Sequence, residues 1–436
     1  MSASLWRSAG FGVGQCLRLA SSLIMTRLLV PEDFGLMAVV FTVHTGLAML
    51  TDLGIRPAIT RSTHGEDPRY LRTAWTVQIV QRGVILCGLL GVALALHLAA
   101  RTFDFGDSVY GRPELPALLA FSGIVMVAAG LQTANTALAE RRMALPAVIA
   151  TELAAQAVTI VAMIAIALVW PSVWALAIGG AVGAVVQTAL GHLIIPGPRM
   201  ALCWDRRHVA EIWHFGKWLM ASSLFGFIAG NGDRLIFGAL FSAETFGLYA
   251  IAMVWIGAAA AAAGQITGPV TLPALSEVRR ERPHDLARVL RRLRRAQDVL
   301  FIGSGLALLL GGPALIATLY PAAYAGAGAF VSLLAVSIAL MRLRPLSVLL
   351  LAGGESRAVT LVSFIACVSL LTLVPAAALC LGDRWAVFLV AINAIWSVPV
   401  LVRLAARHVP LSPRSETAQT ILIVAVFSML TVLAGT

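Results

Sequence analysis

The chain has 436 residues, of which 59% are hydrophobic and only 12% are charged. A soluble protein carries about 25% charged residues, so this composition excludes a soluble globular protein and predicts one that lies mostly in lipid. The formal net charge of +11 comes from arginine, with Lys217 as the single lysine. In a membrane protein, such charge indicates basic cytoplasmic loops rather than nucleic-acid binding.

Apolar runs long enough to cross a bilayer follow one another along the whole chain, since about 20 apolar residues suffice for a membrane helix. They lie near residues 8–30, 35–59, 74–98, 115–139, 146–170, 173–195, 215–240, 245–275, 297–320, 326–352, 358–381, 384–404 and 417–434. We therefore predict an all-α integral membrane protein with thirteen spans. The first run contains Arg18 and is too long for the core of a signal peptide, so we expect no cleavable signal.

A loop motif after the first run returns after the seventh. Residues 28–38 read LLVPEDFGLMA, and residues 240–250, which lie 212 positions later, read LFSAETFGLYA. Such a duplication in a membrane protein indicates two helix bundles that move against each other around a shared site, as in many transporters. We predict a six-helix bundle over 1–200, a second over 201–410 and an additional helix over 411–436.

The loops alternate in charge. Of the 32 basic residues, 23 lie at the N-terminus or in the loops after even-numbered runs, and three lie in the opposite loops. This asymmetry places the N-terminus, 196–214 and 277–297 in the cytoplasm and 101–114 on the other side. Leucines at helical spacing among the arginines of 277–297 predict an amphipathic helix on anionic headgroups, and a nucleic-acid arm is the less favoured alternative.

Polar side chains inside the runs mark a candidate site, because an arginine at the bilayer centre costs at least ~2.5–3.5 kcal/mol. They either pair between helices or line an anion-binding cavity. We favour the cavity, since guanidinium groups bind phosphate oxygens in pairs. Arg18 and Arg234 are expected to face one cavity, one from each bundle, and Arg82 to join them. The candidate substrate-binding residues are Arg18, Gln78, Arg82, Asp233, Arg234 and Arg342.

Signals of catalysis are missing. The chain has no HExxH, no Walker motif and no GxGxxG after a strand, and its five cysteines are scattered. We therefore predict that the protein is not an enzyme and needs neither a cofactor nor a metal ion.

Several short motifs occur together in a fixed order. They are RLLVPEDFGL at 27–36, ERRM at 140–143, Glu152, VWAL at 173–176, FG at 215–216, DR at 233–234, Gly238, GLY at 247–249 and PALS at 273–276. In this order they resemble the polysaccharide transporter (Wzx-like) family of oligosaccharide flippases, in the multidrug/oligosaccharidyl-lipid/polysaccharide flippase superfamily. Members of this family usually have twelve or fourteen spans, whereas thirteen are predicted here.

The resemblance implies a V-shaped pair of six-helix bundles with a central cationic cavity. It implies export of polyprenyl-diphosphate-linked oligosaccharide across the bacterial inner membrane by alternating access, for O-antigen, exopolysaccharide or capsule. The implied partners are this lipid-linked substrate, membrane lipids, and a polysaccharide polymerase with its chain-length machinery, but no nucleic acid.

Two alternatives remain. A multidrug or cation antiporter of the same superfamily would need carboxylates within the membrane, whereas most of the deep ionisable groups here are arginines. A membrane-bound polysaccharide polymerase would need a large outer loop for its active site. The longest outer loop, 101–114, has about 14 residues.

Overall fold

The computed structural model describes residues 3–433, apart from the side chains of 3–5, 215, 217–219, 221, 222, 224 and 356. All regular structure in this part of the chain is helical. Contacts divide the chain into unit 1 (Met1–Phe227) and unit 2 (Ile228–Thr436). The all-α fold is therefore confirmed.

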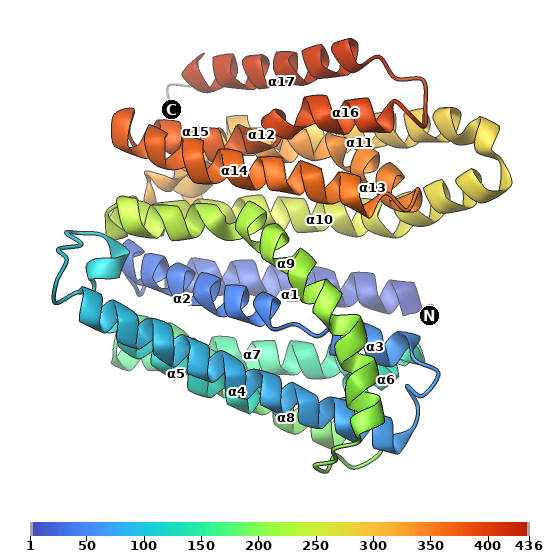
Figure 1. The fold of residues 1–436 in the computed structure, drawn as a ribbon. Helices are drawn as coiled ribbons and strands as arrows, with labels where there is room; N and C mark the ends of the chain where they lie inside the picture. Colours follow the sequence, from blue (N-terminus) through green and yellow to red (C-terminus); the bar gives the residue numbers. More distant parts are fainter. Residues whose placement is uncertain (1–2, 434–436) are drawn as a thin grey trace. The chain divides into compact units, whose positions relative to one another are not determined.

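Unit 1 holds the first eight α-helices, one short 3₁₀ turn and the first part of α9 (Figure 1). They are α1 (Ala3–Met25), α2 (Pro31–Leu50), α3 (Ile55–Arg61), α4 (Pro68–Ala99), η1 (Val109–Gly111), α5 (Glu114–Gly130), α6 (Asn135–Arg141), α7 (Leu145–Val169), α8 (Val173–Ile194) and α9 (Arg206–Leu240). Ile212 of α9 packs with Tyr70 and Leu71 of α4 in a buried apolar cluster. The first part of α9 thus packs on unit 1, although the predicted bundle boundary lies at residue 200.

Unit 2 holds the rest of α9 and all later helices. They are α10 (Ala243–Glu281), η2 (Pro283–Asp285), α11 (Leu286–Leu319), η3 (Ala322–Tyr324), α12 (Ala327–Leu340), η4 (Met341–Leu343), α13 (Arg344–Ala352), α14 (Ser356–Cys380), α15 (Asp383–Ile392), η5 (Asn393–Ser397), α16 (Val398–Ala405) and α17 (Pro413–Leu433).

Ten helices of the described chain are long and apolar enough to span a membrane, or eleven if α5 and α6, bent by 59°, form one span. The predicted count of thirteen is not confirmed, because α1 and α9 are outside this set. The predicted helix at 35–59 is also interrupted. It ends at Leu50, and α3 follows Gly54, which adopts φ +61° while its N–H donates to the Asp52 side chain at 2.8 Å. Glycine takes this left-handed conformation without a steric penalty.

The internal repeat extends from the loop motif to the helices themselves. Helix α2 begins at Pro31 and α10 at Ala243, again 212 residues apart. Proline suits the first turn of α2, and Ser242 caps α10 by accepting the Thr245 N–H at 3.2 Å. The bent pair α5–α6 of unit 1 has its counterpart in α12 and α13 of unit 2, which η4 joins. Two copies of one helical arrangement therefore make up the chain.

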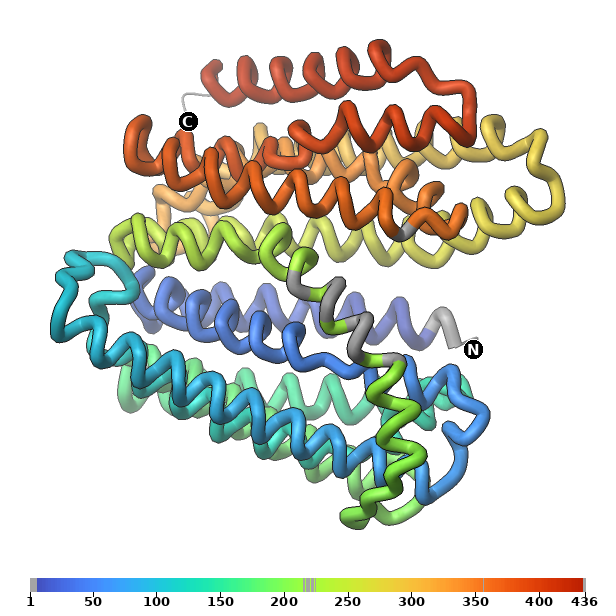
Figure 2. The backbone as a smooth tube through the Cα atoms, viewed as in Figure 1, coloured from blue at the N-terminus to red at the C-terminus, as the bar shows by residue number. Residues whose placement is uncertain are grey.

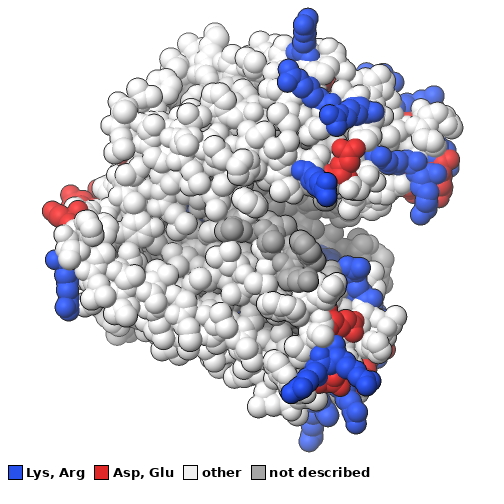
Figure 3. All heavy atoms as spheres, viewed as in Figure 1, with Lys and Arg blue, Asp and Glu red and all other residues white. Residues whose placement is uncertain are grey.

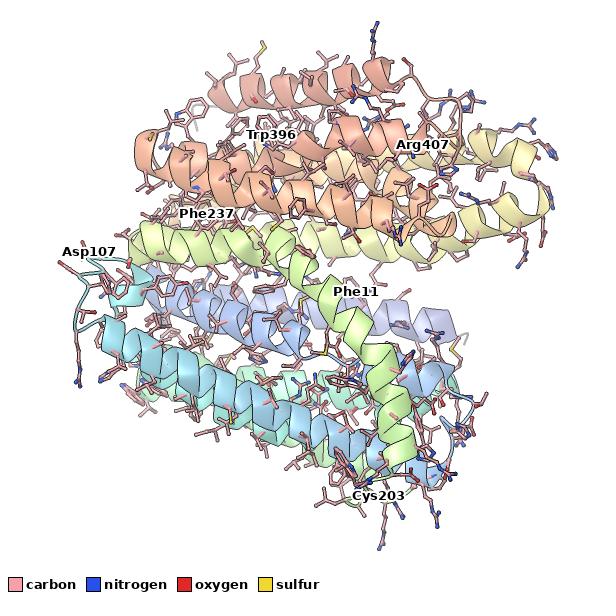
Figure 4. All side chains as sticks on the ribbon, viewed as in Figure 1. Phe11, Asp107, Cys203, Phe237, Trp396 and Arg407 are labelled. Carbon is pink, nitrogen blue, oxygen red and sulfur yellow. The ribbon has the colours of Figure 1, made fainter. Side chains whose placement is uncertain are left out.

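Charged side chains gather at helix ends in each unit, and the visible faces between them carry almost none (Figure 3). In unit 1, Arg142 pairs with Glu66 at 2.7 Å and thereby lowers the pKa of that carboxyl. Asp107 and Cys203 lie at opposite ends of unit 1 (Figure 4). This agrees with the predicted placement of 101–114 and 196–214 on opposite sides of the bilayer.

The prediction of an amphipathic surface helix at 277–297 is wrong. The segment is the turn of the α10–α11 hairpin in unit 2 (Figure 2), where α10 ends at Glu281 and α11 begins at Leu286. Leu286 and Leu290 pack with Leu346 and Leu401 in the core of unit 2. A leucine stripe at helical spacing fits a protein core as well as a membrane surface, so the pattern alone does not distinguish the two.

Candidate functional site

An interrupted helix in unit 1 positions the first group of candidate residues. Helix α5 ends at Gly130 and α6 begins at Asn135, so the carbonyls between them lack helical partners. Gln78 of α4 donates to the carbonyls of Gly130 and Gln132 at 2.8 and 3.0 Å. Non-helical backbone at membrane depth is tolerated where such partners satisfy it. The amide of Gln78 is therefore engaged with the backbone.

The Leu131 carbonyl at the same break is also satisfied by side chains. Trp75 Nε1 donates to it at 3.3 Å, and His192 Nε2 of α8 lies 2.8 Å from it. Together with Gln78, the polar-aromatic stripe of α4 thus holds the bend between α5 and α6.

Arg82 lies one turn beyond Gln78 and has no carboxylate partner. A Cβ on Gly130 would lie 2.5 Å from Arg82 Cγ, so this glycine leaves the space that the arginine stem fills. Arg82 Nη1 contacts Met126 Sδ at 3.5 Å, and Arg82 Nε is buried without a hydrogen-bond partner among the described residues. A partly buried guanidinium without a fixed countercharge is suited to bind an anion.

Unit 2 contains a cavity of about 400 Å³ that four of its helices and the interruptions η4 and η5 line. This volume lies within the ~300–1,000 Å³ of small-molecule sites. Its lining is mostly apolar, with a small set of polar residues: Asp233, Ser337, Arg344, Ser347, Ser363, Asn393 and Ser397. The cavity thus combines one acidic and one basic side chain with several neutral groups.

Asp233 of α9 is fixed from one side of this cavity. It is only 4% exposed, and Tyr249 of α10 donates its hydroxyl to Asp233 Oδ2. The Tyr249 ring packs edge-on against Phe237 and Phe330. The carboxylate is therefore held by an aromatic cluster that leaves it at the cavity wall.

The neighbouring residue, Arg234, makes a local contact. Its Nη1 donates to Asn231 Oδ1 at 3.1 Å, one turn earlier on α9. Arg18 is exposed on α1 of unit 1. The expectation that Arg18 and Arg234 face a common cavity stays a prediction.

Arg342 is neutralised within unit 2. Its Nε and Nη2 donate to the two carboxylate oxygens of Asp298 at 2.8 and 3.2 Å, and its side chain is 5% exposed. A second two-bonded pair joins Arg294 of α11 to Glu416 of α17 at 2.9 and 2.6 Å. Both pairs involve α11, and the second attaches α17 to the rest of unit 2.

Sequence reasoning left out one residue of the cavity, Arg344. It is the first residue of α13, lines the cavity, and has no ion pair among the described side chains. Its position before Pro345 indicated only a helix end. The deciding signal is the neighbouring arginine, because Arg342 has Asp298 as its partner and Arg344 has none.

The comparisons with known proteins concern the family and the fold. The family model described as "Polysaccharide biosynthesis protein" matches residues 24–327. No curated protein matches the chain. Among solved structures, the chain is similar to lipid II flippase MurJ in an inward closed conformation, with a TM-score of 0.73 and 11% identity over 99% of this chain and 96% of that one.

Two further solved structures share the fold. An inward-facing multidrug resistance MATE transporter of the MOP superfamily has a TM-score of 0.66 and 14% identity over 96% of this chain and 99% of that one. A MOP superfamily transporter from Pyrococcus furiosus has a TM-score of 0.62 and 14% identity over 96% of each chain.

These similar structures are a flippase and transporters, in agreement with the expectation that the chain is not an enzyme. The duplicated helical units, the many apolar helices and the shared fold make it a multi-pass membrane protein with a flippase and transporter fold. With about 70% of its length matched by one family model, the chain belongs to the polysaccharide biosynthesis protein family.

Proposed function

We propose that the protein translocates polyprenyl-diphosphate-linked oligosaccharides from the cytoplasmic to the outer leaflet of the bacterial inner membrane, for assembly of a surface polysaccharide. The observation that carries this proposal is the match of a polysaccharide biosynthesis family to a chain with a flippase fold. A family that serves polysaccharide synthesis through such a fold needs a membrane-bound glycan precursor as its cargo.

The side chains of unit 1 support an anionic headgroup. Arg82 presents a guanidinium without a carboxylate partner, next to a helix bend that Gln78 stabilises. A diphosphate moving through a low-dielectric region needs countercharge, which arginine supplies through paired hydrogen bonds. We propose Arg18 and Arg234 as further contacts of this headgroup. Translocation by alternating access then requires no covalent chemistry.

A cation antiporter is the second candidate, and Asp233 is the observation that favours it. A buried carboxylate at the wall of a mostly apolar cavity is a feature expected of cation binding. The structural similarity to MATE transporters is compatible with this alternative.

The deciding experiment is deletion of the gene, followed by measurement of lipid-linked glycan on each membrane face. Accumulation on the cytoplasmic face, reversed by the wild-type gene but not by Arg82→Ala, supports the proposal. Normal glycan assembly together with sensitivity to cationic drugs would replace it with the antiporter.

A further inference from the structure

Unit 1 contains a second hollow, separate from the α5–α6 break, which we term the apolar groove. It has a volume of about 350 Å³ and lies between the end of α2, the middle of α4 and the first part of α9. Its walls include Leu53, Val77, Val84, Ile212 and Trp213.

The lining of the apolar groove selects hydrocarbon. Thr51 and Gln81 are the only polar side chains that line it among the described residues. The Thr51 hydroxyl already donates to the Leu47 carbonyl at 2.8 Å, within its own helix. Without groups that could orient a polar ligand, burial of apolar surface remains the main source of affinity.

The apolar groove is open to the surface of unit 1. Val80 and Val84 of α4 are each about half exposed, as are Trp204 and Trp213 at the other wall. The loop that carries Trp204 is fastened to α4, because the Cys203 N–H donates to Thr76 Oγ1 at 3.0 Å. Tryptophan is typical of the membrane–water boundary, so a chain could enter here from the lipid.

Positive charge lies next to this opening. Arg206 and Arg207 follow Trp204 by two and three residues, and both are exposed. They belong to the end of unit 1 where basic side chains gather (Figure 3). An apolar slot beside a pair of arginines matches a lipid with a long hydrocarbon chain and a strongly anionic headgroup.

We propose that the apolar groove binds the isoprenoid chain of a polyprenyl diphosphate, with Arg206 and Arg207 contacting the diphosphate. This inference rests on the function proposed above and adds a docking site for the substrate's tail at the cytoplasmic end of unit 1. A diphosphate carries more negative charge than a phospholipid's phosphodiester, which is why the paired arginines favour it.

The test is photo-cross-linking of the full-length protein in proteoliposomes with a polyprenyl diphosphate that bears a diazirine on its chain. The expected result is labelling within 77–84 and 204–220, which unlabelled polyprenyl diphosphate removes and phosphatidylglycerol does not. Val80→Trp should fill the groove and abolish most of this labelling. Val161→Trp is the matched control, since Val161 is exposed on α7 and does not line the groove.

A second variant, Arg206→Ala with Arg207→Ala, leaves the groove wall intact and should also weaken the labelling. Displacement of the label by phosphatidylglycerol as efficiently as by polyprenyl diphosphate would overturn the inference and identify an ordinary lipid site. Labelling outside the groove that Val80→Trp leaves unchanged, in a protein that still translocates lipid-linked oligosaccharide, would overturn the inference alone. Loss of the proposed function itself would appear separately, as normal glycan distribution in the deletion strain.

Discussion

The two units interrupt a helix at the same place in the repeat, but they stabilise the interruption in different ways. In unit 1, the carbonyls between α5 and α6 accept hydrogen bonds from Gln78 and Trp75 of α4, and the nearby Arg82 has no carboxylate partner. In unit 2, η4 continues the backbone between α12 and α13, and its arginine, Arg342, forms an ion pair with Asp298 of α11.

This difference indicates how duplicated halves diverge. The helix that supports the break carries a cation in unit 1, Arg82 of α4, and an anion in unit 2, Asp298 of α11. The arginine of unit 2 is therefore used for structure, whereas that of unit 1 is available for an anionic ligand. The predictions below test this assignment, beginning with the largest expected effect.

Removing the arginine of unit 2 should destabilise the protein. Arg342→Ala leaves the Asp298 carboxylate partly buried without its partner, which typically costs ~3–5 kcal/mol. Thermal unfolding of the purified protein in detergent should show a clear drop in Tm. The double variant Arg342→Ala, Asp298→Ala should recover part of it, because no lone charge remains. An unchanged Tm in Arg342→Ala would show that the pair is not structural.

Removing the arginine of unit 1 should impair transport instead. Arg82→Ala deletes a charged hydrogen-bond donor worth ~1.5–3 kcal/mol, or about 10- to 100-fold in headgroup affinity. Export of glycan should fall accordingly while protein yield and Tm stay near wild type. Arg82→Lys should retain part of the activity, since lysine keeps the charge without the paired donors.

The control for this variant is Arg288→Ala, which removes an arginine that is 81% exposed in the α10–α11 turn. It should export normally. If Arg82→Ala exports as well as this control, Arg82 is not part of an anion site.

Gln78 should affect the bend rather than the ligand. Gln78→Leu leaves the carbonyls of Gly130 and Gln132 without their donor, at a cost of ~1–3 kcal/mol. Hydrogen exchange around the α5–α6 break should accelerate, and Tm should fall. Gln15→Leu on α1 is the control, because Gln15 has no hydrogen-bond partner among the described side chains. Equal effects of both variants would argue against a role of Gln78 in holding the break.

The smallest effect should be the pH dependence of the Arg142–Glu66 pair. The Arg142 guanidinium lowers the pKa of Glu66 below its ordinary value of 4.5. The stabilisation is therefore fully present above pH about 4.5 and is lost as the pH falls through the lowered pKa. Glu66→Gln should remove this small component from a Tm-versus-pH curve. A curve that is identical in the variant would show that the exposed pair contributes nothing measurable.

The sequence alone determined the class of the protein. Its apolar runs require lipid as solvent, and the motif that returns after 212 residues predicts the duplicated helical arrangement, because length, hydropathy and turn residues act locally. The resemblance carried by its motifs also led to the family that the comparison confirms.

Only the tertiary structure decided what each polar side chain does. Gln78, Arg82 and Arg342 look alike in sequence, as polar groups within apolar runs. Their roles depend on what lies opposite: backbone carbonyls for Gln78, a methionine sulfur for Arg82 and the Asp298 carboxylate for Arg342. These partners are 40 to 60 residues away along the chain, and which of them meet is determined by helix packing. A hydropathy pattern records how apolar a residue's neighbourhood is along the chain, but not which distant groups that packing brings to it.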